Sequence, residues 1–298
     1  MEKRLILRGI AAGGFAGLLA ALFTRIMAEP VIQKSIDYES GRDAAVSVLR
    51  KAAGLGPYPP DLTIFSRGVQ RNVGAPIGLV LFGMAMGAVF AVLFVLVYRR
   101  YGEQLNPRVI AVIIAGAALL AVYLVPYLKY PANPPAIGHP DTIHARGNLY
   151  LGLVAVSIVS LVAAFFLARY LAARWGGWNA AIATAIVFIA WMAIVMAIFP
   201  PLGHLHTNVV QYGKVATETP LPLKNPHGQI VYPGFPADVL FKFRLYSVLN
   251  QIILWSTIGL TFGLLAERVV APATSRAARA EGTPVPARGK GRAPLAAE

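Results

Sequence analysis

Six long stretches without a charged side chain divide this sequence, and they restrict its fold more than any other feature. A helix needs about 20 apolar residues to cross the hydrocarbon of a bilayer. Only 13% of the 298 residues are charged, whereas soluble proteins average about 25%. The sequence therefore predicts an all-α integral membrane protein, a bundle of about six transmembrane helices. The stretches are residues 9–24, 73–98, 109–128, 149–168, 178–200 and 245–266.

The basic residues predict the orientation of this bundle. Arginines fill the short links after the second and fourth stretches, and such residues gather on the cytoplasmic side. Both termini are therefore expected inside, with the long connections 29–72, 129–148 and 201–244 outside. Residues 1–270 would form the transmembrane domain, and the basic segment 271–298 a disordered cytoplasmic tail. Attraction to anionic lipid explains the net charge of +14 better than nucleic-acid binding.

The first stretch is short and follows a basic start, which is also the form of a secretory signal peptide. No small-x-small cleavage site stands at residues 28–30, so a retained helix is favoured. Glycines repeat at spacing four in the first, second and sixth stretches, and this spacing lets helices pack closely in lipid. The pairs predict tight packing inside the fold or in a homo-oligomer, and they are Gly13 and Gly17, Gly74 and Gly78, Gly83 and Gly87, and Gly259 and Gly263.

All five histidines lie in the second and third outer connections, and imidazole is the commonest metal ligand near neutral pH. Their spacings match no strong zinc pattern, so solvated or capping histidines stay the alternative. His227 stands in a turn-forming sequence, and Asp141 is placed to cap a helix with His144 in its first turn. The candidate metal ligands are His139, Asp141, His144, His204 and His206.

Polar side chains near the membrane are few. Arg25 and Glu29 stand four apart, a spacing that predicts a helical ion pair at the edge of the first stretch. Asn250 and Gln251 enter the sixth stretch, where polar side chains more often join helices than touch a substrate. The candidate transport path comprises Arg25, Glu29, Lys129, Asn133, Asn250 and Gln251.

The chain carries no nucleotide-binding loop, no HExxH and no serine-centred elbow. ATP hydrolysis on this chain is therefore excluded, and a transporter of this kind would use a gradient, act as a channel or rely on a partner. A membrane enzyme with Asp141, His144 and Arg146 acting on lipid or quinone is the weaker reading, since three polar residues in one turn are weak support.

Several segments together resemble the CbtA-type family, the proposed cobalt transporter subunits. They are RIMAEPVI, SRGVQRNVG, YLVPYLKYPANPPAIGHPDTI, GFPADVLFKFRLYSVLNQIILW and LLAER. The resemblance implies Co²⁺ as a transported substrate with no tightly bound cofactor. It also implies a small histidine-bearing partner of the CbtB type, the plasma membrane of a prokaryote, and a link to cobalamin biosynthesis. The proline-rich segment 129–147 would then form a rigid entrance beside the bundle.

The sequence thus predicts the membrane subunit of a cobalt uptake transporter and not an enzyme. The alternative is a membrane scaffold that transports nothing and docks a partner through its outer loops. The near absence of charge inside the predicted helices favours that alternative.

Overall fold

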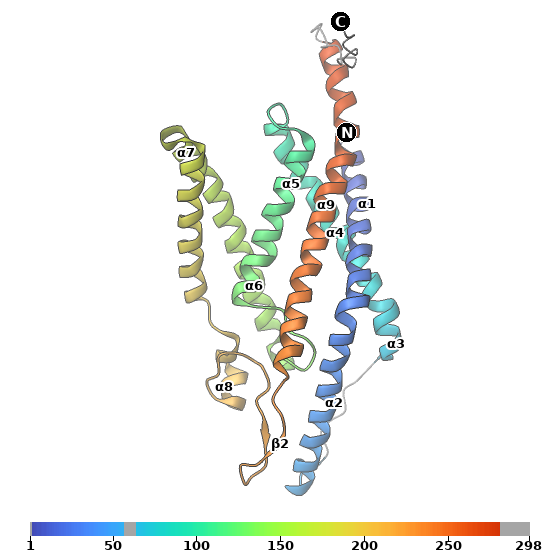
Figure 1. The fold of residues 1–298 in the computed structure, drawn as a ribbon, viewed down its shortest axis with the longest axis vertical. Helices are drawn as coiled ribbons and strands as arrows, with labels where there is room; N and C mark the ends of the chain where they lie inside the picture. Colours follow the sequence, from blue (N-terminus) through green and yellow to red (C-terminus); the bar gives the residue numbers. More distant parts are fainter. Residues whose placement is uncertain (1, 57–63, 281–298) are drawn as a thin grey trace, which may run out of the picture.

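The computed structural model describes residues 2–56 and 64–280, and they fold almost entirely into helices (Figure 1). Five of these helices are long and apolar enough to span a membrane. The prediction of an all-α membrane protein is therefore confirmed. The candidate spans are Glu2–Ala52, Arg67–Tyr101, Pro107–Lys129, Pro140–His204 and Ala237–Val270.

The fourth candidate span contains two of the six predicted stretches, 149–168 and 178–200. Its main helix, α7 (Ile143–Ile198), is interrupted at Gly176, where φ is 76° and ψ is 160°. Glycine adopts a positive φ without the clash that a Cβ would cause. Figure 1 shows the chain turning back within α7, so that the two limbs of this helix lie side by side.

The first span continues well beyond the first apolar stretch. Helix α1 (Glu2–Phe23), the π-helical turn η1 (Thr24–Ala28) and α2 (Glu29–Ala52) follow one another without a break. Helix α2 occupies much of the connection 29–72, for which the sequence predicted no helix. The second span is built in the same way from α3 (Arg67–Val69), η2 (Gln70–Gly74) and α4 (Ala75–Tyr101).

Three π-helical turns in the described chain each stand directly before a helix whose second residue is proline. The third is η3 (Leu119–Leu124), between α5 (Pro107–Ala118) and α6 (Val125–Lys129). Proline has no N–H and crowds the carbonyl four residues earlier, so the wider turn relieves a local conflict. At Pro126 the carbonyl concerned is that of Val122, and the Tyr150 hydroxyl of α7 donates to it at 3.2 Å. This hydrogen bond ties the π-helical turn before Pro126 to the next span.

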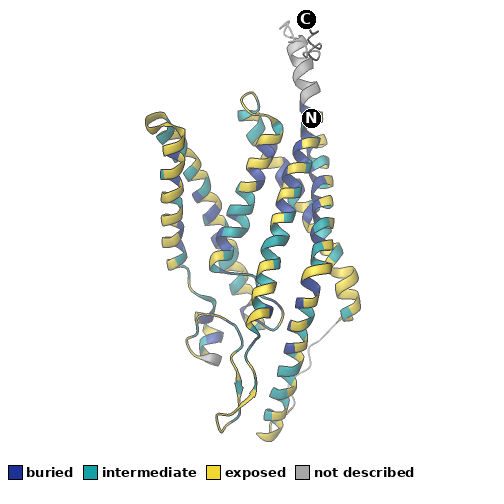
Figure 2. Ribbon diagram, viewed as in Figure 1, coloured by how far each residue is buried: buried dark blue, intermediate teal, exposed yellow. Residues whose placement is uncertain are grey.

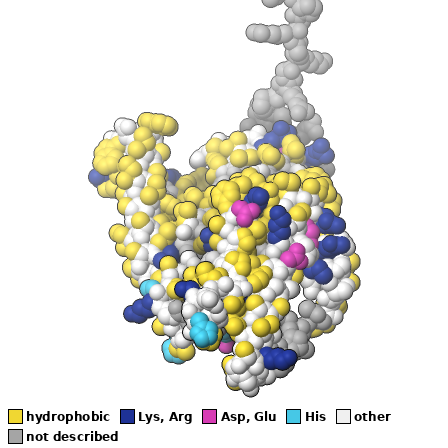
Figure 3. Space-filling view, turned by 60° about the horizontal axis from the view of Figure 1, so that its bottom comes forward, with side chains coloured by type: hydrophobic (Ala, Val, Ile, Leu, Met, Phe, Trp, Pro, Cys, Tyr) yellow, Lys and Arg dark blue, Asp and Glu magenta, His cyan; other side chains and the backbone are white. Residues whose placement is uncertain are grey.

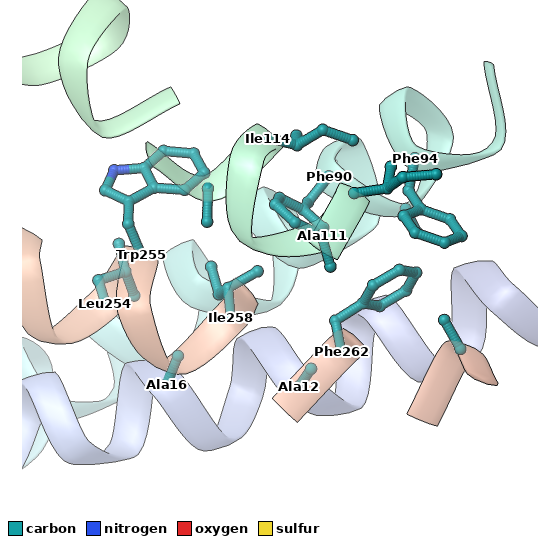
Figure 4. Packing of buried hydrophobic residues seen from close by; sticks show 14 of the residues in the cluster. Ala12, Ala16, Phe90, Phe94, Ala111, Ile114, Leu254, Trp255, Ile258 and Phe262 are labelled. Atoms are coloured by element: carbon teal, nitrogen blue, oxygen red, sulfur yellow. The ribbon is translucent and has the colours of Figure 1, made fainter. Parts of the chain in front are cut away.

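The main core lies between α1, α4, α5 and α9 (Ala237–Ala280), where aromatic rings meet small residues (Figure 4). The Phe262 ring lies 5.3 Å from the Phe90 ring and 5.0 Å from the Phe94 ring, edge to face. Helices α1 and α4 approach so closely that a Cβ at Gly13 would overlap the carbonyl oxygen of Gly83. Close glycine packing within one chain is therefore confirmed for three of the four predicted pairs. It is wrong for Gly74 and Gly78, because a Cβ at Gly78 would meet nothing within 4 Å.

The long connections gather at one end of the molecule, opposite the start of α1 and the turn of α7 (Figure 1). They include η4 (Pro140–Thr142), η5 (Leu202–His204), α8 (His206–Tyr212) and an antiparallel hairpin of β1 (Leu223–Lys224) and β2 (Ile230–Tyr232). We call this the loop end.

Helix α9 extends to Ala280, so the first part of the predicted disordered tail 271–298 is helical. Residues 281–298 of that tail lie outside the described residues.

Candidate functional site

The proline-rich segment 129–147 crosses the loop end between α6 and α7, and it is anchored at its start by Tyr130. The Tyr130 hydroxyl donates to the carbonyl of Pro200 at 2.8 Å. Burial raises the pKa of the Tyr130 phenol, so the group stays a neutral donor at pH 7. This bond joins the start of the segment to the end of α7.

The middle of the segment is held by Arg244 of α9. Its Nη2 donates to Oδ1 of Asn133 at 2.9 Å and its Nε to the carbonyl of Ala132 at 3.4 Å. Within the described residues no carboxylate lies in ion-pair distance of this half-buried guanidinium. Asn133, a predicted path residue, is thus fixed by an arginine that the sequence did not single out.

Next along the segment, Ile137 is buried in an apolar cluster with Val31 and Tyr38 of α2 and with Phe235 and Val239. The residue before it, Ala136, has φ 71°, which L-residues with a Cβ rarely adopt. The segment is therefore packed on both sides around a backbone conformation that is unfavourable in isolation.

The prediction that Asp141 caps α7 is wrong. The structure uses the His139 ring, whose Nδ1 accepts from the backbone N–H of Asp141 at 3.2 Å, at the start of the 3₁₀ turn η4. Pro140 holds His139 extended, at φ −79° and ψ 138°, which is the backbone conformation of an N-cap. His139 Nδ1 also lies 3.6 Å from Asp141 Oδ2.

At its end the segment contacts the buried carboxylate of Glu218, around which several polar side chains gather. Its Oε1 accepts from the Thr142 hydroxyl at 2.7 Å and from Nδ2 of Asn208 at 2.7 Å. Its Oε2 lies 3.5 Å from Nη1 of Arg146. We call His139, Thr142, Arg146, Asn208 and Glu218 the Glu218 cluster.

The Glu218 cluster joins three parts of the chain: the segment 129–147, α8, and the connection between α8 and β1. Gly138 has φ +107°, and a Cβ there would overlap the Arg146 guanidinium, so the glycine leaves room for it. Sequence reasoning missed Glu218, Thr142 and Asn208. The partners of Glu218 lie in α8, in η4 and at the start of α7, up to 76 residues away. No spacing pattern in the sequence marks them.

The predicted metal ligands are only partly brought together. His139 and Asp141 are neighbours, whereas His144, His204 and His206 are exposed. Figure 3 shows histidine side chains on the surface at the loop end. Among the described residues no group of three or more His, Asp or Glu side chains is placed to hold a metal ion. A metal role for these five residues stays a prediction.

The predicted ion pair of Arg25 with Glu29 does not form. Glu29 is buried, 6% exposed, and pairs instead with Arg67 of α3, while Arg25 is exposed. Arg25 lies within η1 and Glu29 directly follows it, and the π-helical winding removes the alignment that spacing four has in an α-helix. Arg67 is the ion-pair partner that local spacing missed.

Asn250 joins helices, as its type and place suggested. Its Nδ2 donates to the carbonyl of Ala20 at 2.9 Å and to the Thr24 hydroxyl at 2.6 Å, so α9 is bound to α1 at η1. Lys129 and Gln251 are half-buried, and the described part of the chain gives their side chains no hydrogen bond. Of the predicted path residues, three are held in place: Glu29, Asn133 and Asn250.

Comparison with known proteins gives one match. The model of a family described as "Probable cobalt transporter subunit (CbtA)" matches residues 2–267. No curated protein and no solved structure matches the chain. The matched range includes four of the candidate spans in full, all of the loop end, and the fifth span up to residue 267.

Proposed function

We propose, from the premise that this chain belongs to the CbtA family of probable cobalt transporter subunits, that it is the membrane subunit of a cobalt uptake transporter. Co²⁺ is its substrate and not a resident cofactor. It works in the plasma membrane of a prokaryote with a small histidine-bearing CbtB-type partner, and it supplies cobalt to cobalamin biosynthesis.

One observation carries this proposal, the family match over residues 2–267. The fold supports it, because a chain that turns back at Gly176 within α7 would cross the membrane six times with five long helices. The two short links and both ends of the bundle then face the cytoplasm, and the loop end faces outward.

The transport path begins at the segment 129–147 and continues past Asn250 and Glu29. A divalent ion without ligands is prohibitively unstable in hydrocarbon, so oxygen or nitrogen atoms must stand at intervals along the way. The Glu29 carboxylate and the Asn250 side chain both lie near η1, where α1 meets α9. These groups supply polar atoms at the depth where the apolar spans begin.

The direct test is uptake of radiolabelled cobalt into cells that lack other cobalt importers. Cells carry the chain alone, a candidate partner alone, both, or neither, and nickel and zinc serve as competitors. We expect saturable uptake that requires the chain and persists in excess zinc. Absence of uptake in every combination, with the protein shown to be inserted, would contradict the proposal and leave the scaffold alternative in front.

A further inference from the structure

Apart from Arg146, the Glu218 cluster contains more oxygen acceptors than hydrogens to satisfy them. The Thr142 hydroxyl carries one hydrogen, yet it lies 2.7 Å from both Glu218 Oε1 and the His139 carbonyl oxygen. Asn208 Nδ2 donates to the Leu202 carbonyl and to Glu218, and its own Oδ1 has no partner among the described residues. In the same part of the chain no group donates a hydrogen bond to Glu218 Oε2. The cluster therefore has oxygen lone pairs without a hydrogen, and such lone pairs favour the binding of a cation.

Burial makes this surplus costly. The Glu218 side chain is 1% exposed and Asn208 is fully buried. A carboxylate removed from water needs close and complete compensation by opposite charge and hydrogen bonds. Here the nearest cation in the described chain is Arg146, at 3.5 Å.

Arg146 compensates this carboxylate poorly. A guanidinium that pairs well with a carboxylate makes two parallel bonds of about 2.7 to 2.9 Å. Arg146 makes one contact with Glu218 at 3.5 Å and one with the His139 carbonyl at 3.5 Å, and its buried Nε has no partner in the described residues. Its side chain is 25% exposed, so it has a route to solvent. Arg146 is therefore a loose counter-ion.

The second buried carboxylate of the described chain provides a contrast. Glu29 is bound directly by Arg67, whose Nη2 donates to Oε1 in a close ion pair. The Nε of Arg67 also has no partner in the described residues, so the two pairs differ in the carboxylate contact, which is a direct hydrogen bond at Glu29 and a 3.5 Å approach at Glu218. Of the two, the carboxylate of Glu218 is the one whose arginine can be displaced.

We propose that the Glu218 cluster is a divalent-cation site at the loop end, in which Arg146 occupies the place of the cation until one arrives. The ligands are the carboxylate oxygens of Glu218, Oδ1 of Asn208 and the hydroxyl oxygen of Thr142, a set of donors that suits hard and borderline divalent ions. Identification of that ion as Co²⁺ rests on the proposed function. The site would be where the ion first leaves water.

The test is Co²⁺ binding to the purified full-length chain in nanodiscs, measured by equilibrium dialysis with radiolabelled cobalt. Glu218→Gln removes the charged ligand, so we expect the Kd to rise at least about tenfold. Arg146→Gln removes the competitor. If the pair is closed about nine-tenths of the time, the Kd falls about tenfold. The matched controls are Glu267→Gln and Arg108→Gln, from an exposed ion pair remote from the cluster, and both should leave the Kd within about twofold of the original.

The two variants are expected to shift the Kd in opposite directions. Loss of folding cannot explain this result, because a misfolded variant does not bind more tightly. Glu218→Asp, which keeps the charge, should retain binding that Glu218→Gln loses. The proposal is overturned if Arg146→Gln binds Co²⁺ no more tightly than the original chain, or if Glu218→Gln binds it equally well.

Parallel uptake measurements separate this proposal from the proposed function. Opposite shifts in Kd without cellular uptake would establish the cation site and remove the transporter. Chain-dependent uptake with no gain of binding in Arg146→Gln would keep the transporter and remove the site.

Discussion

The pair of α1 and α4 and the hairpin of α7 are both apolar, yet they are packed in opposite ways (Figure 2). Helices α1 and α4 touch through their backbones at Gly9, Gly13, Gly83 and Gly87, and the facing sides are buried. Most of α7 is exposed. Since lipid tails are as apolar as leucine, an apolar helix face needs no protein cover. Close contact between helices instead demands small residues on both.

The α7 hairpin is held by an apolar cluster, in which Leu153, Met192 and Val195 pack with Val125 and Tyr130, and by single polar bonds. Nε1 of Trp191 donates to the Ser160 hydroxyl at 3.0 Å between the limbs. Tyr150 and Tyr130 bind it to the bundle near the loop end. Backbone contact fixes one region, whereas an apolar cluster near the loop end and a few hydrogen bonds position the other.

The largest effect should follow from closing the backbone contact. Gly13→Leu places a side chain where the carbonyl of Gly83 lies, so we expect a loss of more than about 3 kcal/mol of stability. Gly116→Leu in α5 meets nothing within 4 Å and should be neutral or slightly stabilising. Thermal unfolding in detergent, followed by size-exclusion chromatography, measures both. Equal melting temperatures would show that α1 and α4 are not in contact.

The next largest effect concerns the ion pair at the outer end of the packed region. Glu29→Gln leaves Arg67 without its partner beside a buried side chain, and breaking a buried pair costs about 3 to 5 kcal/mol. Glu267→Gln breaks an exposed pair and should cost under about 1 kcal/mol. Thermal unfolding again separates them, and cobalt uptake should be lost only in the first variant. A Glu29→Gln protein as stable as Glu267→Gln would mean that the pair is solvated.

A smaller loss is expected where the hairpin meets the bundle. Tyr150→Phe removes the donor to the Val122 carbonyl, which should cost about 1 kcal/mol. Tyr170→Phe on the exposed part of α7 keeps the ring that lies under Arg174 and should change nothing measurable. If both variants unfold at the original temperature, the π-helical turn before Pro126 does not need the hydrogen bond from Tyr150.

The smallest effect tests a polar bond inside the packed region. Asn250→Ala removes the bonds to Ala20 and Thr24, and such bonds in membrane proteins average about 0.6 kcal/mol. Gln251→Ala on the next residue is the matched control. Unfolding by denaturing detergent at graded mole fractions resolves differences of this size, and a greater loss in the control would reverse the assignment.

The features that could be predicted are those written in consecutive residues. Apolar length predicted the spans, and spacing four predicted the glycine contacts. Two of the errors, the Asp141 cap and the pair of Arg25 with Glu29, came from assuming regular helix geometry where Pro140 and η1 interrupt it. The missed residues, Arg67, Glu218 and Arg244, find their partners 38, 76 and 111 residues away. Pairing at that range depends on the fold and leaves no local pattern.

The backbone of Ala136 gives the segment 129–147 a property of its own. A left-handed conformation costs an L-residue about 1 to 2 kcal/mol, and it persists only where the surroundings determine it. Tyr130, Asn133 and Ile137 fix the chain at and around this residue, and the Glu218 cluster fixes it beyond. Release of these anchors would let Ala136 relax. The contacts of the proline-rich segment therefore hold it in a conformation that its own backbone disfavours.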